Sequence, residues 1–293
     1  MPGLITPPAG LIPLGGRPRM RDYLRMAWER REFAFNLAQG QFRTQNMDTV
    51  LGNVWQLINP ILLIAIYYLI FGVVLNRGDS DIGPSNYIGF LSVGVFVYSY
   101  QQRTITAGAS AIINNLGLIR SLQFPRAVLP AATMVKEVLG FGSSLLVMLL
   151  LMFVTGEGLH LDMLWFPVAF VLITAFAFGG ALMTARMTEA VRDVRNLLPF
   201  VFRLLFYVSG VLYDPHALAR GRPRAVELLD RFDWMLLFNP FYVYVSLARD
   251  SLMSTYEPPQ MPGIWAASVA WALVALVFGL WYFLGAEKKY GRG

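Results

Sequence analysis

Long apolar segments separated by short polar turns dominate the chain from about residue 54 onward. A transmembrane α-helix needs about 20 mostly apolar residues to cross the roughly 30 Å of bilayer hydrocarbon. Most of the segments reach this length, and only the fifth is clearly shorter. The pattern therefore predicts an all-α polytopic membrane protein with six transmembrane helices. The expected spans cover about 54–75, 87–106, 127–154, 164–184, 197–212 and 264–284.

The N-terminal part begins irregularly and then becomes amphipathic. Residues 1–20 are rich in Pro and Gly and are predicted to form a flexible tail. Within residues 21–52, apolar side chains such as Tyr23, Leu24 and Trp28 recur at roughly helical spacing between arginines. Because this basic stretch directly precedes the first span, we expect a cytosolic amphipathic helix lying in the headgroup region. A soluble surface helix is the alternative.

The segment 214–262, before the last span, has a mixed character. Its two apolar runs, 234–238 and 241–248, are each too short to cross a bilayer. Short apolar runs between spans are typical of re-entrant helices, which are stable only where protein buries their ends. An apolar outer cap is the alternative interpretation.

Composition and charge support lipid as the solvent of this chain. Of its 293 residues, 56% are hydrophobic and only 14% are charged, whereas soluble domains have about 25% charged residues. The net charge of +6 does not indicate a nucleic-acid partner, because the basic residues flank apolar segments, where they set orientation. The N-terminal region, 108–126, 186–195 and the tail 286–293 are basic. The positive-inside rule therefore places both termini in the cytosol.

No pattern of a cleaved signal peptide precedes the first span. We therefore expect the first spans to direct insertion themselves. The predicted localisation is the plasma membrane, as a multi-pass protein.

Motifs that would give the chain its own chemistry are absent from the sequence. Neither G-x-x-x-x-G-K-[ST] nor G-x-G-x-x-G occurs, so there is no P-loop for ATP, and there is no cysteine. His160 and His216 lie far apart in predicted outside segments and are expected to be exposed rather than metal ligands. We therefore expect no enzymatic activity, no cofactor and no metal in this chain. If it transports, a partner must supply the energy.

Charged residues inside the apolar segments are few, and they include Lys136, Glu137 and Arg203. Lys136 and Glu137 are expected near the cytosolic third of their span, where a long Lys side chain can reach the interface. Arg203 lies midway through the short fifth segment, so we expect it to face the bundle interior, a partner or water. Two roles stay open for it: an anion contact in a transport path, or an ion pair with Glu137.

Four segments carry a family pattern. In chain order they read FRTQNMDTVLGNVWQLINPILLIAIYYLIFG, IRSLQFPRAVLPAA, RDVRNLLPFVFRLLFYVSGVLYDP and FNPFYVYVSLARDSLM. Their basic entry, Gly-x-x-Trp, Asn-Pro, Phe-Pro-Arg and Arg-Asp-x-Arg features, in this order within residues 40–290, resemble the ABC-2 family of export permeases. The combination looks like the polysaccharide subgroup of that family, and the tail AEKKYGRG looks like the mycobacterial galactan type.

The resemblance implies a type V exporter architecture and a homodimer that works with two separate ABC ATPase subunits. ATP and Mg would then bind to the partner ATPase. The implied activity is export of a lipid-pyrophosphate-linked polysaccharide, with a cell-wall galactan precursor as the expected cargo. Two features depart from the family pattern: Arg203, where an uncharged polar residue is expected, and the longer Pro/Gly-rich N-terminus.

A long polymer does not fit an enclosed pocket of about 300–1,000 Å³, so we expect the dimer to form a continuous channel. Sugar C–H faces stack on aromatic rings. The predicted channel lining is Tyr67, Tyr68, Phe71, Phe96, Tyr98, Tyr100 and Arg203. Lipid-facing rings or an interfacial belt are the alternative for these aromatics.

Three further sites are predicted. The lipid pyrophosphate, or alternatively anionic lipid, would meet cations near the cytosolic mouth; these are Arg21, Arg25, Arg30, Arg31 and Arg43. The coupling segment 108–126 would dock on the ATPase through Ser110, Asn114, Asn115 and Arg120. The region 214–262 would gate the outer mouth through Asn239, Pro240, Tyr242 and Tyr244.

Three competing functions remain at this point. An ABC-2 permease that exports a drug or a small lipid would share the same fold. A membrane glycosyltransferase would need an acidic cluster, and Glu189 with Asp193 is a poor candidate because arginines adjoin both. A passive channel is disfavoured by the four family-like segments.

Overall fold

The computed structural model describes residues 20–45, 51–74, 86–219, 223, 227, 233–254, 256 and 261–286. Most of the predicted tails, residues 75–85 and part of the outer gate region therefore lie outside the described residues. The α-helices are α1 (Met20–Glu29), α2 (Arg31–Thr44), α3 (Trp55–Tyr67), α4 (Tyr87–Ala111), α5 (Leu116–Ser121), α6 (Val128–Val154), α7 (Phe166–Ala190), α8 (Val194–Val208), α9 (Pro215–Ala219), α11 (Pro240–Leu252) and α12 (Met261–Leu284). Shorter helical segments are η1 (Gly52–Val54), the π-helical η2 (Tyr68–Val74), η3 (Ile113–Asn115), η4 (Leu161–Trp165) and η5 (Asp233–Phe238).

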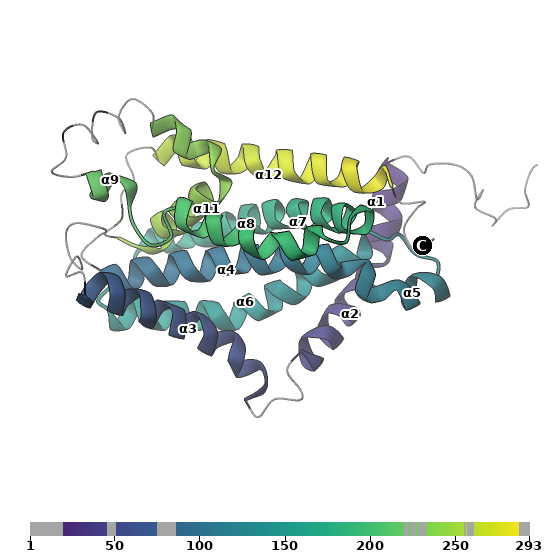
Figure 1. Ribbon diagram of the computed structural model, residues 1–293, viewed down its shortest axis with the longest axis horizontal. Helices are drawn as coiled ribbons and strands as arrows, with labels where there is room; N and C mark the ends of the chain where they lie inside the picture. The colour runs from purple at the N-terminus through teal and green to yellow at the C-terminus, as the bar shows by residue number, and fades with distance from the viewer. Residues whose placement is uncertain are drawn as a thin grey trace, which may run out of the picture.

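The long helices form one bundle (Figure 1). In that view α12 runs along the upper edge, α3 and α2 lie along the lower edge, and α4, α6, α7 and α8 lie between them. Helix α5 projects from one end of the bundle and α9 lies at the other end. Helix α1 and the end of α12 lie at the end that carries α5, as an even number of membrane crossings requires.

Three helices are long and apolar enough to cross a membrane by themselves, in the part of the chain that the structure describes. They are Val128–Val154, Leu161–Ala190 and Pro262–Leu284. With the shorter apolar helices beside them, they confirm an all-α polytopic membrane fold. The predicted first span is interrupted, because α3 continues into the π-helical segment η2.

Helix α4 is the central helix of the bundle. Of its 25 residues, 18 are buried, and the buried set includes the polar residues Ser92, Gln101 and Thr104. The hydroxyl of Thr104 donates a hydrogen bond to the carbonyl of Tyr100 at 2.9 Å. A helix enclosed by other helices does not need a uniformly apolar surface. This explains why α4 is long enough to cross the membrane but less apolar than the three helices above.

Small residues bring α7 and α12 together at backbone contact. A Cβ atom added at Gly279 of α12 would lie 2.5 Å from the carbonyl oxygen of Gly179 on α7. Ala275, one turn before Gly279, approaches the backbone of Gly179 from the same helix. Small residues four apart allow membrane helices to pack closely, since lipid gives no hydrophobic drive for helix association.

The fifth crossing is divided between two parts of the chain. Helix α8 has 15 residues, about 22 Å at 1.5 Å per residue, which is short of the roughly 30 Å hydrocarbon core. At its end the hydroxyl of Ser209 lies 3.1 Å from the Nδ2 of Asn239, which begins the re-entrant helix α11.

The first turn of α11 lies inside the bundle rather than on top of it. The Phe241 ring contacts the ring of Tyr98, whose residue is near the middle of α4, with the centroids 5.4 Å apart. Before Asn239, the carbonyl of Leu237 in η5 accepts a hydrogen bond from the Trp271 indole of α12 at 2.9 Å. The second apolar run therefore packs inside the bundle, as the re-entrant interpretation predicts, whereas Trp234, Met235 and Phe238 of the first run are each more than half exposed.

The predicted amphipathic stretch forms two helices that dock on the bundle. The helix is interrupted at Arg30, which forms a turn between α1 and α2. Ala34 and Ala38 of α2 pack against Val128 and Ala132 of α6. The hydroxyl of Tyr23 accepts a hydrogen bond from the backbone N–H of Ala127 at 3.0 Å. The N-terminal helices are thus fixed to the first turns of α6.

Candidate functional site

The predicted channel aromatics of the second span lie in the core of the protomer. Phe96, Tyr98 and Tyr100 on α4 are each 1% exposed or less. The Tyr98 hydroxyl donates to the carbonyl of Phe202, and the Tyr100 hydroxyl lies 2.9 Å from that of Thr174. These rings connect α4 to α7 and α8. Their role as channel lining stays a prediction, and it would require the helices to separate.

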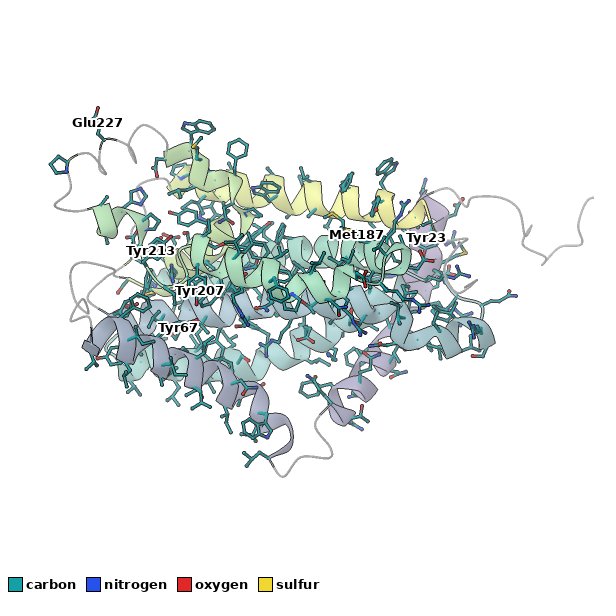
Figure 2. All side chains as sticks on the ribbon, in the orientation of Figure 1. Tyr23, Tyr67, Met187, Tyr207, Tyr213 and Glu227 are labelled. Carbon is teal, nitrogen blue, oxygen red and sulfur yellow. The ribbon has the colours of Figure 1, made fainter. Side chains whose placement is uncertain are left out.

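The predicted aromatics of the first span have a different environment. Tyr67 is half-buried and stacks on Phe206 of α8, with ring centroids 5.5 Å apart. Tyr68 is exposed and Phe71 is half-buried. The π-helical turn of η2 begins at Tyr68; such turns are rare and are found frequently at functional sites. The Tyr67 ring therefore lies at the contact between α3 and α8, near Tyr207 of α8 (Figure 2), and it also contacts the Phe71 ring of η2, with centroids 6.4 Å apart.

Arg203 is exposed on the outward face of α8. Its neighbours on that face, Phe200 and Tyr207, are 69% and 49% exposed. The alternative of an ion pair with Glu137 is wrong, because the Glu137 carboxylate lies 2.9 Å from Lys136 Nζ and 3.9 Å from Arg103 Nε. Among the described residues no carboxylate forms a salt bridge with Arg203. We call Tyr67, Tyr68, Phe71, Arg203 and Tyr207 the α3–α8 surface.

A charge on this surface restricts what can cover it. An arginine at the centre of a lipid-facing helix costs about 2.5–3.5 kcal/mol, and such residues almost always face protein or water. The α3–α8 surface is therefore suited to face a second protein chain or a water-filled path.

The five predicted pyrophosphate-binding arginines are all exposed but do not converge. Arg21 lies in the first turn of α1 and Arg43 in the last turn of α2, at opposite ends of the two helices. Arg25 Nε pairs with the Glu29 carboxylate at 3.2 Å, and the Arg31 guanidinium lies over the Trp28 ring at 5.4 Å. Arg30 is at the break between the two helices. One pyrophosphate could therefore contact only a subset of these side chains.

The predicted coupling segment projects from the end of the bundle near α1 (Figure 1). Helix α4 extends to Ala111, so Ser110 belongs to its last turn, and the Asn115 amide donates to the Ala111 carbonyl at 2.8 Å. Asn114 and Arg120 are exposed. The short helix α5 thus presents a polar surface beyond the ends of the spans.

The predicted outer-gate residues lie at the start of α11: Asn239 is its N-cap, and Pro240, Tyr242 and Tyr244 belong to its first turns. The Asn239 side chain caps α11, since its Oδ1 accepts the backbone N–H of Phe241 at 3.1 Å. Pro240 occupies the first helical position, where its missing N–H costs nothing. Tyr242 and Tyr244 are buried, and the Tyr244 hydroxyl donates to the carbonyl of Ser268 on α12 at 2.8 Å.

Comparison with known proteins identifies the family. The model of the family described as ABC-2 type transporter matches residues 34–253, which run from α2 to just past α11. This chain belongs to the ABC-2 type transporter family.

Curated relatives in the ABC-2 family include polysaccharide transport proteins. The chain is 26% identical over 208 residues to an O-antigen export system permease protein of Klebsiella pneumoniae, covering 71% of this chain and 74% of that protein. It is 25% identical over 234 residues to the corresponding protein of Myxococcus xanthus, covering 80% and 82%. It is 22% identical over 221 residues to a polysialic acid transport protein of Escherichia coli, covering 74% and 79%.

One buried residue of this ABC-2 chain has a larger structural role than its sequence context indicates. The guanidinium of Arg249 on α11 donates to the carbonyls of Gly210 at 2.8 Å, Val211 at 2.7 Å and Phe90 at 3.1 Å, and it is 1% exposed. It thereby joins α4, α11 and the turn after α8. A single arginine in a mixed segment gives no sequence signal of such contacts. Gly94 of α4 leaves space for the guanidinium, because a Cβ atom there would overlap Arg249 Nη2.

The segment between α8 and α11 of this ABC-2 chain contains a histidine between two carboxylates. His216 Nε2 lies 2.9 Å from Asp233 Oδ1, and its Nδ1 lies 3.6 Å from Asp214 Oδ1. Hydrogen bonding to Asp214 and the nearby Asp233 raise the pKa of His216, against an opposing effect of burial. His216 is therefore half-buried and paired, not exposed as predicted. Within the described ranges, no group of three or more side chains is arranged to hold a metal ion.

Proposed function

We propose that this chain is the membrane-spanning permease subunit of an ABC transporter that exports a lipid-pyrophosphate-linked polysaccharide across the plasma membrane. The polysaccharide transport named in its relatives supports this cargo class. The resemblance of its C-terminal tail to galactan exporters makes a cell-wall galactan precursor the cargo we favour. Because the sequence contains no P-loop, we propose that ATP hydrolysis, with Mg, takes place in a separate ATPase subunit.

The observation that carries this proposal is the α3–α8 surface. It combines exposed aromatic rings, suited to sugar C–H faces, with a cation that is costly in lipid. In a homodimer, two such surfaces would face each other and enclose a continuous path that is partly aromatic and partly wet. A surface of this kind matches an uncharged or weakly charged polymer better than a purely apolar drug.

The other predicted sites fit the same arrangement, in which this chain forms the membrane path and a separate ATPase hydrolyses ATP. The exposed polar side chains of α5 are available to an ATPase at the end of the bundle that we assign to the cytosol. Exposed arginines on α1 and α2 are available to a pyrophosphate at the same end, in subsets rather than together. The re-entrant helix α11 lies at the opposite half of the bundle, where it would gate the outer mouth.

Reconstitution tests the proposal directly. The purified chain and its cognate ATPase are placed in liposomes, and ATP-dependent transfer of a lipid-linked galactan is followed with a lectin or a galactan-specific antibody. We expect transfer only when both proteins and ATP are present, and no ATP hydrolysis by the permease alone. Hydrolysis by the permease alone would contradict the proposal. ATP-dependent transfer of a hydrophobic dye but not of galactan would favour a drug exporter.

A further inference from the structure

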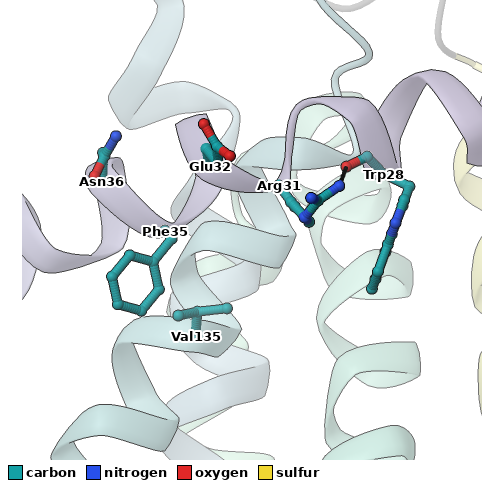
Figure 3. Close-up of a pocket in the computed structure, with 6 residues that line it drawn as sticks. All are labelled: Trp28, Arg31, Glu32, Phe35, Asn36 and Val135. Atoms are coloured by element: carbon teal, nitrogen blue, oxygen red, sulfur yellow. Dashed lines mark hydrogen bonds between the residues drawn. The ribbon is translucent and has the colours of Figure 1, made fainter.

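A hollow lies where α1 and α2 meet the cytosolic part of α6 (Figure 3). Its volume is about 560 Å³, within the range of about 300–1,000 Å³ that is typical of small-ligand sites. It is lined by Trp28, Arg31, Glu32, Phe35, Asn36 and Val135. We call these six residues the α1–α2 hollow. It is separate from the α3–α8 surface and shares only Arg31 with the predicted pyrophosphate site.

Helical spacing brings the lining residues together. On α2, Arg31 and Phe35 are four residues apart, as are Glu32 and Asn36, so these four side chains follow one side of that helix, and Trp28 lies near the end of α1 just before it. Trp28 and Phe35 are 69% and 46% exposed, although both are large apolar side chains. Figure 3 shows the Phe35 ring beside Val135, with Arg31 between Phe35 and Trp28. The hollow is therefore bounded by two exposed aromatic rings.

The guanidinium of Arg31 is held in place by Trp28. Its central carbon lies 5.4 Å from the centroid of the Trp28 ring, and its Nη1 donates to the Trp28 carbonyl at 3.5 Å. Glu32 and Asn36 add a carboxylate and an amide on the other edge of α2 (Figure 3). The hollow thus combines aromatic faces with three kinds of planar hydrogen-bonding group.

This combination fits an uncharged sugar ring better than a phosphate. The charges of Arg31 and Glu32 cancel, so the hollow has no net positive charge to attract a pyrophosphate. Sugar rings present apolar C–H faces that stack on aromatic rings, and their hydroxyls both donate and accept, which suits a guanidinium, a carboxylate and an amide together. We infer that the α1–α2 hollow is a saccharide-binding subsite for uncharged sugar units of the exported polymer. This inference rests on the proposed function.

Insertion of Trp28 and Phe35 into lipid headgroups is the competing use of this surface. Interfacial helices place basic and apolar residues toward an anionic membrane surface. Here the Glu32 carboxylate lines the same hollow as Arg31, so the lining has no net positive charge to attract anionic headgroups. The charge pattern therefore favours the sugar.

The test uses the full chain in nanodiscs and measures binding of linear uncharged hexasaccharides of galactose, mannose and glucose by saturation-transfer NMR. We expect binding of at least one of them, and about a tenfold loss of affinity in Trp28→Ala and in Phe35→Ala. Leu24→Ala is the matched control, because it removes an exposed apolar side chain of α1 outside the hollow. Inorganic pyrophosphate should not compete with the sugar.

Three results would overturn the inference. The first is binding of pyrophosphate that depends on Arg31 without any sugar binding, which would make the hollow an anion site. The second is the absence of sugar binding together with quenching of Trp28 fluorescence by brominated lipids, which would make the hollow a membrane anchor. The Trp28 signal is obtained as the difference between the wild type and Trp28→Phe. The third is equal sugar affinity in the wild type, Trp28→Ala and Phe35→Ala.

Failure of the inference and failure of the proposed function give different results. If the wild type exports polymer with its ATPase while Trp28→Ala and Phe35→Ala bind sugar and export like the wild type, only the inference fails. If no polymer is exported by the wild type but sugar binding depends on Trp28, the proposed function fails and the saccharide site stands.

Discussion

Two groups of tyrosine and phenylalanine side chains in this protein have different surroundings. The rings of α4 are enclosed on all sides by α6, α7, α8 and α11, whereas those of α3, η2 and α8 are partly exposed beside Arg203. The comparison teaches that aromatic content alone does not mark a sugar path in a membrane protein. What separates the two groups is the combination of exposure with a charge that lipid does not accommodate.

The largest expected effect is on stability, at the enclosed group. Tyr98→Ala removes a ring that contacts both Phe206 and Phe241, and comparable core substitutions cost about 3–5 kcal/mol. Denaturant unfolding in detergent micelles measures the loss. Tyr68→Ala is the matched control, because that ring is exposed, and it should unfold like the wild type. Equal destabilisation by both variants would remove the distinction between the two groups.

Arg203 tests the exposed group through transport rather than stability. Arg203→Leu should leave the folded yield unchanged and lower polymer export about tenfold, equivalent to about 1.4 kcal/mol, because a charge that faces water or substrate is lost. Arg203→Lys should retain most of the export. The readout is ATP-dependent polymer transfer in liposomes. If Arg203→Leu exports normally and is more stable than the wild type, the α3–α8 surface faces lipid.

Substitution of Asn239 tests whether the first turn of α11, which packs beside the enclosed aromatic rings of α4, depends on its N-cap. Asn239→Ala removes the acceptor for the N–H of Phe241, and loss of an N-cap residue costs about 1 kcal/mol. Hydrogen exchange should increase in the first turn of α11. Asn239→Asp, which keeps the acceptor oxygen, is the control and should retain most of the protection. No change in exchange would show that packing alone holds the first turn of α11.

His216 gives the smallest effect and concerns the segment between α8 and α11. Its pKa is raised above the ordinary value of 6.5, so its protonated form stabilises the folded loop. This stabilisation is complete below about 6.5 and is lost as pH rises through the higher folded-state pKa. Hydrogen exchange of residues 214–219 should therefore increase with pH beyond the intrinsic rate in the wild type. His216→Gln should abolish the excess, and an identical excess in that variant would contradict this assignment.

The sequence predicted which parts of the chain form helices better than it predicted what those helices contact. Length and composition were sufficient for α6, α7 and α12, because a lipid-facing helix must be apolar along most of its surface. The aromatic residues of α4 and α3 look alike in sequence, since helical periodicity shows a shared face but not its partner. The distinction required knowing that Phe141 and Phe170 enclose Tyr100.

Long-range polar contacts were the least predictable feature. Arg249 bonds to carbonyl groups of Phe90 and Gly210, which are 159 and 39 residues away in the chain, and backbone carbonyls leave no trace in the sequence. The lone Arg203 was identified as unusual because it interrupts an apolar segment. Of the two roles left open for it, the ion pair with Glu137 is wrong, because that carboxylate pairs with Lys136 and Arg103.

The divided fifth crossing has a consequence for how the protein is made. A ribosome synthesises α8 well before α11, yet the carbonyls that follow α8 are satisfied by residues of α11. The Gly210 and Val211 carbonyls bond to Arg249, and the Val208 carbonyl accepts from Asn239 at 3.5 Å. Bare carbonyls are costly in hydrocarbon, so this crossing cannot reach its final form while the nascent chain ends before Arg249. Nascent chains truncated on either side of that residue should therefore differ in how deeply the end of α8 enters the bilayer.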